Sequence, residues 1–99
     1  MKMLITAATK MEIQPLMDAK DTIRTNAEIV FHTSGIGMMA TTFSLARAIE
    51  QYKPELVVQA GIAGCFDAMF PLGTIVVVGK EYIADIFRPY IKRCSGQMV

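Results

Sequence analysis

The sequence predicts a three-layer α/β domain with a mainly parallel or mixed sheet. Apolar runs of strand length alternate with segments of helical spacing in the order β-α-β-α-β-β, which is typical of layered α/β folds. The first run, residues 2–8, is nearly continuously apolar, as expected for a central parallel strand covered on both faces. A chain of 99 residues has room for one domain and a modest core.

The first strand leads into a predicted helix over residues 10–19. Thr9 can cap this helix, and Glu12 follows at the spacing of a capping box. Apolar residues recur at helical intervals from Met11 onward. Pro15 is readily accommodated only in the first turn of a helix, so we expect this helix to start late or to bend.

The polar residues 20–27 predict a turn, and residues 28–33 predict the second strand. A glycine pair then opens a long helix that we expect to run to about Tyr52 and to have Met38, Met39 and Phe43 on its apolar faces.

Two further strands are predicted, over residues 55–60 and 74–79, and Pro71-Leu72-Gly73 forms the turn into the second of them. Residues 87–99 differ in character, because they contain three basic residues and no acidic one. Pro89 argues against a continuous helix or a central strand there. We therefore divide the chain into residues 1–86, part of an α/β domain, and an atypical basic tail, 87–99.

Composition excludes several classes of function. The net charge of +1 gives no electrostatic reason to bind nucleic acid or an anionic membrane. Cys65, Cys94 and one histidine do not predict a zinc site or a disulfide framework, and we expect no metal and no cofactor. No apolar run approaches the ~20 residues of a membrane span. We expect a cytoplasmic protein with a small-molecule ligand.

Two glycine clusters follow predicted strands. Residues 34–37 (Ser-Gly-Ile-Gly) come after the second strand and residues 61–64 (Gly-Ile-Ala-Gly) after the third. Glycine lets backbone approach a ligand closely, and ligands of open α/β sheets bind at the carboxyl ends of the strands. The alternative for each cluster is a purely structural turn. A dinucleotide site is disfavoured, because the first cluster lacks the third glycine of that fingerprint.

Glu12 is the sharpest candidate for chemistry. A carboxylate just past the first strand could act as a general base on water. The alternative is a capping-box glutamate with a structural role. His32 and Cys65 are more simply interpreted as packing residues, Cys65 as a small buried hydrophobe.

Residues 1–85 resemble the amino-terminal portion of the purine nucleoside phosphorylase and nucleosidase superfamily. Four segments carry the resemblance in the same order: residues 1–16, the turn at 34–38, residues 53–64 (Lys-Pro-Glu-Leu-Val-Val-Gln-Ala-Gly-Ile-Ala-Gly) and residues 72–78 (Leu-Gly-Thr-Ile-Val-Val-Val). Within the superfamily, Ala-Ala-Thr-Lys-Met-Glu and the short connection between Ala19 and Glu28 are most similar to futalosine hydrolases, nucleosidases of menaquinone biosynthesis.

The resemblance implies hydrolysis of the N-ribosyl bond of a purine-type nucleoside, futalosine or a relative. Glu12 matches the glutamate that orients or deprotonates the attacking water. Ala8 and Thr9 match the loop beside the ribose. Gly35 and Gly37 match a structural turn near the site. The loop that lines the base and sugar is matched by Ile62, Ala63 and Gly64.

The resemblance also has a limit. Family domains are longer, and their later half supplies a Met-Glu pair for the ribose hydroxyls and an aspartate that protonates the leaving base. After Asp85 neither element can be matched, and Asp85 itself is not assigned that role. We therefore expect a truncated or frame-shifted product that is inactive alone, and self-association through an exposed sheet edge. A nucleoside phosphorylase and a non-enzymatic α/β binding or assembly module are the alternatives.

Overall fold

The computed structural model describes residues 1–82. The chain divides into two units, Met1–Gly64 and Cys65–Val99. The first unit contains the sheet and both helices, in the order β1 (Lys2–Ala7), α1 (Lys10–Asp18), β2 (Glu28–Thr33), α2 (Met38–Tyr52) and β3 (Leu56–Gln59). A short 3-10 turn, η1 (Lys20–Thr22), follows α1 within the predicted turn region. The predicted class is confirmed.

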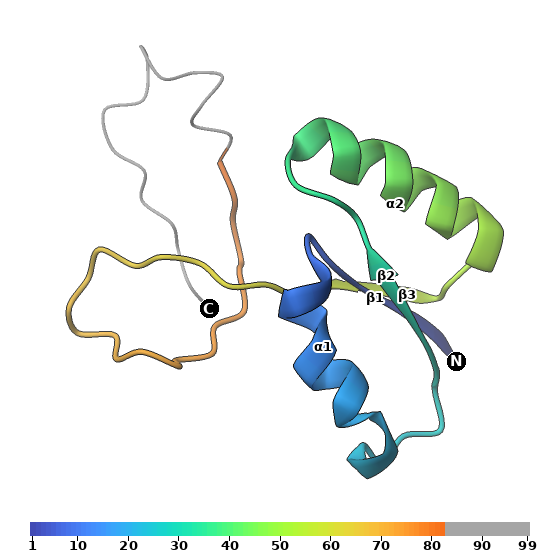
Figure 1. The fold of residues 1–99 in the computed structure, drawn as a ribbon, viewed down its shortest axis with the longest axis horizontal. Helices are drawn as coiled ribbons and strands as arrows, with labels where there is room; N and C mark the ends of the chain where they lie inside the picture. The colour runs from blue at the N-terminus through green and yellow to red at the C-terminus, as the bar shows by residue number, and fades with distance from the viewer. Residues whose placement is uncertain (83–99) are drawn as a thin grey trace. The chain divides into compact units, whose positions relative to one another are not determined.

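The sheet is parallel, with the strand order β2-β1-β3. β1 is therefore central, as its continuous apolar character predicts, and its last four residues are buried. The first crossover runs from β1 to β2, and the second runs in the opposite direction, from β2 across β1 to β3. Right-handed connections therefore place α1 and α2 on opposite faces of the sheet. Figure 1 shows the sheet between the two helices.

Alternate residues of β1 serve the two faces, because successive side chains of a strand point to opposite sides. On one face Ile5 and Ala7 form a core cluster with Ile13 of α1. On the other, Leu4 and Thr6 are completely buried beneath α2, where Ala48 is also buried. Each layer thus depends on small or branched side chains that fit a narrow gap between helix and sheet.

The start of α1 differs from one expectation. The helix begins at Lys10 and contains Pro15, so a late start is wrong. The capping box at Thr9 explains why the helix can begin early, because it satisfies backbone donors at the first turn. Pro15 removes one helical donor but still accepts a hydrogen bond, its carbonyl taking the N–H of Ala19 at 3.1 Å.

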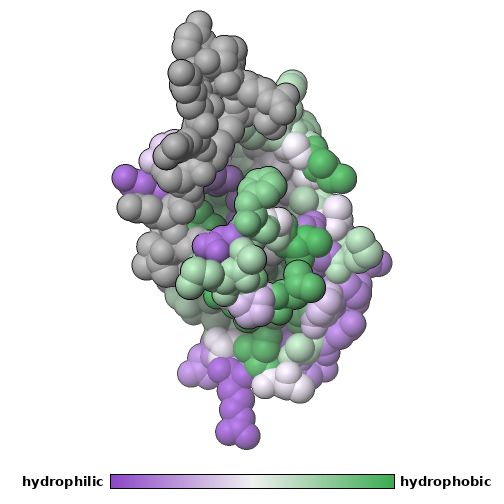
Figure 2. Space-filling view, turned by 90° about the vertical axis from the view of Figure 1, so that its left-hand side faces the viewer, coloured by the Kyte–Doolittle hydropathy of each residue, from purple (hydrophilic) through white to green (hydrophobic). Residues whose placement is uncertain are grey.

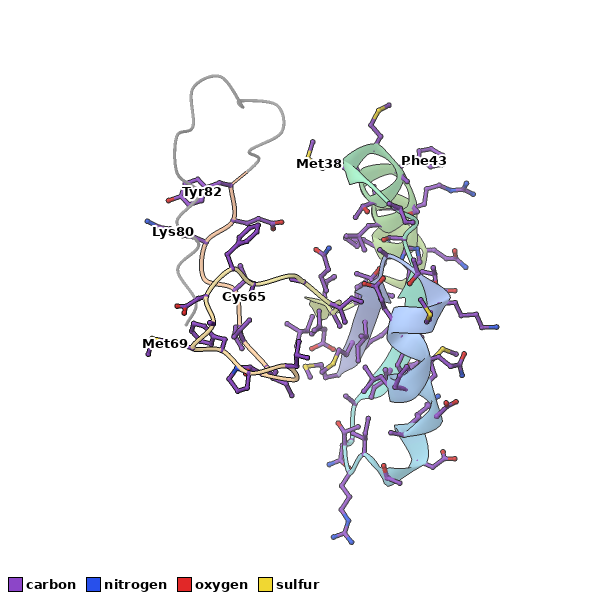
Figure 3. All side chains as sticks on the ribbon, turned by 60° about the vertical axis from the view of Figure 1, so that its left-hand side comes forward. Met38, Phe43, Cys65, Met69, Lys80 and Tyr82 are labelled. Atoms are coloured by element: carbon purple, nitrogen blue, oxygen red, sulfur yellow. The ribbon has the colours of Figure 1, made fainter. Side chains whose placement is uncertain are left out.

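The long helix ends at Tyr52 as predicted, but three of the residues expected on its apolar faces are exposed. Met38, Met39 and Phe43 are 52%, 88% and 66% exposed. Figure 3 shows Met38 and Phe43 projecting from α2. The helix instead buries Ala48, and its Ser44 hydroxyl donates a 2.8 Å hydrogen bond to the Ser34 carbonyl in the turn after β2.

The predicted strand over residues 74–79 is wrong: these residues contain an isolated bridge at Val78 and no regular strand. Ile75 and Val77 are 93% and 71% exposed. An apolar, β-branched run favours extended backbone, but a strand also needs hydrogen bonds to a neighbouring strand. The sheet of the described residues consists of β2, β1 and β3 and does not include residues 74–79. The predicted turn before it is present, with the N–H of Thr74 donating to the Pro71 carbonyl at 3.2 Å.

The surface of the described residues carries many apolar side chains. Figure 2 shows hydrophobic residues beside polar ones on the face it presents. In the second unit Phe66, Met69 and Leu72 are each more than four-fifths exposed, and Cys65 is exposed too, so its assignment as a small buried hydrophobe is wrong. Asp85 and the tail 87–99 lie outside the described residues. No helix among residues 1–82 is long and apolar enough to cross a membrane.

Candidate active site

The carboxyl ends of the three parallel strands meet at one edge of the sheet. Backbone hydrogen bonds extend the pairing past the strand ends: the N–H of Ser34 donates to the Ala7 carbonyl at 2.8 Å, and that of Gly35 to the Ala8 carbonyl at 3.1 Å. On the other side of β1, the N–H of Ala60 donates to the Thr6 carbonyl at 2.8 Å. The loop after β1 is therefore flanked by both glycine clusters, as parallel pairing requires.

Glu12 is held at this edge by the first turn of α1. Its Oε2 accepts a hydrogen bond from the Thr9 backbone N–H at 3.0 Å and one from the Thr9 hydroxyl at 2.8 Å. The Thr9 hydroxyl in turn accepts from the Glu12 backbone N–H at 3.4 Å. The predicted capping box is confirmed, and it fixes the carboxylate beside the end of β1.

The other oxygen of Glu12 contacts the second glycine cluster. Its Oε1 accepts a hydrogen bond from the Ile62 backbone N–H at 3.3 Å. A Cβ added at Gly61 would lie 3.4 Å from the same oxygen, an ordinary contact distance, so the loop runs directly beside the carboxylate. Glu12 thus joins the loop after β1 to the loop after β3, two of the segments in which we expected ligand contacts.

These donors lower the pKa of the Glu12 carboxyl below its usual range. The largest cause is the hydrogen bond from the Thr9 hydroxyl, followed by that from the Ile62 N–H, and the Thr9 N–H adds to them. Desolvation opposes them by raising the pKa. Hydrogen bonds to the charged form favour it, so the carboxylate is ionised at neutral pH and can accept a further hydrogen bond.

The turn between β2 and α2 depends on glycine. Gly35 and Gly37 have φ of +87° and +95°, in the left-handed region that other residues rarely adopt. A Cβ at Gly35 would also lie only 3.2 Å from the Cβ of Ala40. Ser34 is buried, and its carbonyl accepts a 2.8 Å hydrogen bond from the Ser44 hydroxyl, which ties the turn to α2.

Not every residue predicted for the site makes such a contact. Ala63 and Gly64 are exposed, and a Cβ at Gly64 would meet nothing within 4 Å. Ala8 contributes its carbonyl to the Gly35 hydrogen bond. Among residues 1–82 there is no cluster of three or more histidine, cysteine or acidic side chains that could hold a metal ion.

Sequence reasoning missed a polar pair under α2. Thr6 and His32 are partners in the β1–β2 register, and the Thr6 Oγ1 lies 2.9 Å from the His32 Nδ1. Gln59 is the partner of Thr6 on the other side. The parallel register could have revealed this row. His32 and Gln59 each lie two residues before a glycine cluster, and if the clusters end neighbouring strands, these residues fall in one row with Thr6 across the sheet.

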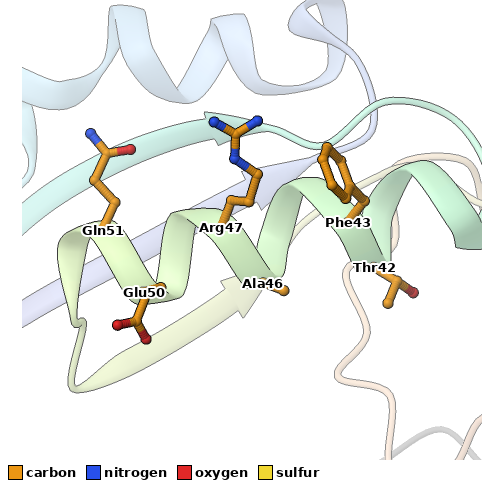
Figure 4. Close-up of a pocket in the computed structure, with 6 residues that line it drawn as sticks. All are labelled: Thr42, Phe43, Ala46, Arg47, Glu50 and Gln51. Carbon is orange, nitrogen blue, oxygen red and sulfur yellow. The ribbon is translucent and has the colours of Figure 1, made fainter.

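A surface hollow lies along α2. Phe43 and Arg47 project from the same side of the helix, and the Arg47 guanidinium lies 5.5 Å from the centre of the Phe43 ring (Figure 4). A single helix forms this hollow, so it lacks the converging groups of a catalytic site. Its lining residues are Thr42, Phe43, Ala46, Arg47, Glu50 and Gln51.

Residues 7–95 of the sequence match the family described as the Phosphorylase superfamily. The chain belongs to this superfamily. The match includes Glu12, both glycine clusters, β2 and β3, and it begins at Ala7, the last residue of β1.

The curated relatives of this superfamily member include three proteins named 5'-methylthioadenosine/S-adenosylhomocysteine nucleosidase. The protein of Shewanella oneidensis is 34% identical over 85 residues, which are 84% of this chain and 36% of that protein. That of Colwellia psychrerythraea is 35% identical over 60 residues, 61% of this chain and 25% of that protein. That of Staphylococcus epidermidis is 38% identical over 50 residues, 50% of this chain and 22% of that protein.

The chain therefore spans little more than a third of the length of these relatives at most. No solved structure matches the chain.

Proposed function

We propose that this chain carries the water-activating half of a nucleosidase site. In the proposed reaction, water attacks the anomeric carbon of a nucleoside, the N-ribosyl bond breaks, and the base departs with a proton from a general acid. The observation that carries the proposal is Glu12, whose carboxylate joins the loops after β1 and β3 at the carboxyl edge of the sheet. That edge is where open α/β sheets bind ligands.

Glu12 is proposed to orient the water and to receive its proton as the bond to carbon forms. The carboxylate has the geometry for this role, because its two oxygens are fixed by different loops and Oε1, which accepts one hydrogen bond, has a lone pair left for the water. Its lowered pKa makes it a weaker base but keeps it ionised, so orientation of the water is the larger contribution.

Water is favoured over phosphate as the nucleophile. The ionised Glu12 would repel a phosphate dianion at this edge. The loop after β1, Ala8-Thr9, contains neither the glycine nor the arginine expected of a phosphate-binding loop. The relatives, moreover, are named as nucleosidases. A phosphorylase is therefore the second candidate and not the first.

The proposed substrates are purine-type nucleosides. The names of the relatives suggest 5'-methylthioadenosine and S-adenosylhomocysteine. The stretch around Thr9 and the short connection between Ala19 and Glu28 suggest futalosine. In either case the backbone of residues 61–64 would line the base and the sugar, and the loop 8–9 would lie beside the ribose.

A base-release assay on the purified chain tests the proposal. Each nucleoside is incubated with and without phosphate, using the wild type, Glu12→Gln and the matched control Glu50→Gln, an exposed glutamate of α2. We expect no release by the chain alone, which is far shorter than its relatives. Any release that does occur must disappear in Glu12→Gln and persist in Glu50→Gln.

Two results would overturn the proposal. Release that survives Glu12→Gln would remove the glutamate from the mechanism, and release that requires phosphate would favour the phosphorylase.

The capping box itself favours a non-enzymatic alternative, since it gives Glu12 a structural role without any chemistry. Absence of any nucleoside binding would support that alternative.

A further inference from the structure

The Thr9 hydroxyl makes two hydrogen bonds of opposite sense. It donates to the Glu12 Oε2 at 2.8 Å and accepts from the Glu12 backbone N–H at 3.4 Å. Helix capping requires only the acceptor, which Asp, Asn and Ser also provide, and glycine at this position costs only a few tenths of a kcal/mol. The donor bond is the shorter of the two and is not explained by capping.

The donor bond goes to the Glu12 carboxylate at the strand edge. Within residues 1–82, this carboxylate accepts three hydrogen bonds, of which the one from the Thr9 hydroxyl is the shortest and the only one from a side chain. Because it fixes Oε2, the remaining oxygen faces the Ile62 backbone and the loop that follows β3. Loss of the hydroxyl would leave Oε2 with the Thr9 backbone N–H alone and Oε1 with the Ile62 backbone N–H.

We propose that Thr9 is a positioning residue for Glu12, whose hydroxyl fixes the carboxylate at the strand edge, and not a contact for the substrate. This inference rests on the proposed function for its biological meaning. It changes the role expected for Thr9, because the single O–H donor of this hydroxyl is already used by Glu12 and cannot also be donated to a ribose.

Hydrogen bonds, and not ion pairs among residues 1–82, hold the Glu12 carboxylate in place. Among residues 1–82 the single ion pair joins Lys53 and Glu50 on α2. Lys10 is the nearest charged neighbour in α1, and no salt bridge connects it to Glu12 in this part of the chain. His32 is engaged with Thr6 on the opposite face of the sheet. No salt bridge from a cation among residues 1–82 therefore competes with the Thr9 hydroxyl in holding the carboxylate.

The test is a titration of the Glu12 carboxyl by carbon-13 NMR on the wild-type chain, Thr9→Ser and Thr9→Gly. Serine retains the hydroxyl, whereas glycine removes it and keeps a tolerable helix cap. We expect the pKa of Glu12 to rise in Thr9→Gly toward the ordinary range of glutamate and to stay at the wild-type value in Thr9→Ser. Glu50 in the same spectra is the internal control and should not move.

An unchanged Glu12 pKa in Thr9→Gly would overturn the inference, and so would an equal rise in Thr9→Ser, since that would assign the effect to the methyl group. If Thr9→Gly does not fold in buffer, sucrose, which favours the folded state, is added to all three samples; a pKa that fails to rise there also overturns the inference. The titration needs no ligand, so it separates this inference from the proposed function, which fails if nucleosides do not bind.

Discussion

The Glu12 carboxylate and the Ile62 backbone N–H, 50 residues apart in sequence, are joined by a hydrogen bond of 3.3 Å. This contact connects the start of α1 to the loop after β3, and it exists because β1 and β3 are adjacent and parallel. A capping glutamate needs no such partner. The contact therefore gives Glu12 a place at the strand edge in addition to its place in the helix.

The first prediction concerns the helix cap. Thr9→Ala removes the side-chain acceptor for the Glu12 N–H, and we expect a loss of about 0.5–2 kcal/mol in the free energy of unfolding. Urea denaturation measures it. Thr42→Ala is the matched control, because that exposed hydroxyl bonds only to a carbonyl of its own helix and should change stability by less than about 0.5 kcal/mol. Equal effects of the two variants would contradict a capping role.

The second prediction concerns pH. The pKa of Glu12 is lowered in the folded chain, so near this pKa the folded chain binds fewer protons at this site than the unfolded chain does. The resulting stabilisation is fully present above the ordinary glutamate pKa and is lost as the pH falls through the lowered folded value. Urea denaturation across the acid range should show a smaller loss of stability in Glu12→Gln than in the wild type, whereas parallel curves would contradict the assignment.

The third prediction concerns the turn before α2. Gly35→Ala should destabilise the chain by about 1–3 kcal/mol, because alanine is strained at a φ of +87° and its Cβ would crowd Ala40. Gly64→Ala is the control: its added Cβ meets nothing within 4 Å. Thermal or chemical denaturation compares them. A Gly35→Ala variant as stable as Gly64→Ala would refute the conformational requirement.

Particular elements show how far the sequence predicts this structure. β2 and the end of α2 agree with the predicted bounds, because strand-length apolar runs and Lys53-Pro54 are local signals. The strand predicted over residues 74–79 is wrong, since a local preference for extended backbone does not supply a neighbouring strand. The Glu12 capping box could be read locally, whereas the contact with Ile62 and the Thr6–His32 pair depend on the strand order, which no local pattern contains.

The fourth prediction is a proposal about association. β3 pairs with β1 on one side, and its Leu56, Val57 and Val58 are each 37–43% exposed. Exposed apolar edge strands pair with other chains, so we propose that this chain forms homo-oligomers. Sedimentation velocity should show association that weakens in Val57→Lys. A monomer at high concentration would contradict the proposal.

The central claim is that the strand edge around Glu12 binds a nucleoside, and amide NMR tests it most directly. The nitrogen-15-labelled chain is titrated with 5'-methylthioadenosine, with adenine and ribose as separate controls. The account predicts that the nucleoside causes the largest shifts at residues 8–12 and 60–64, and that adenine or ribose alone causes smaller ones. Absence of shifts in these loops at saturating nucleoside, or shifts confined to α2, would contradict it.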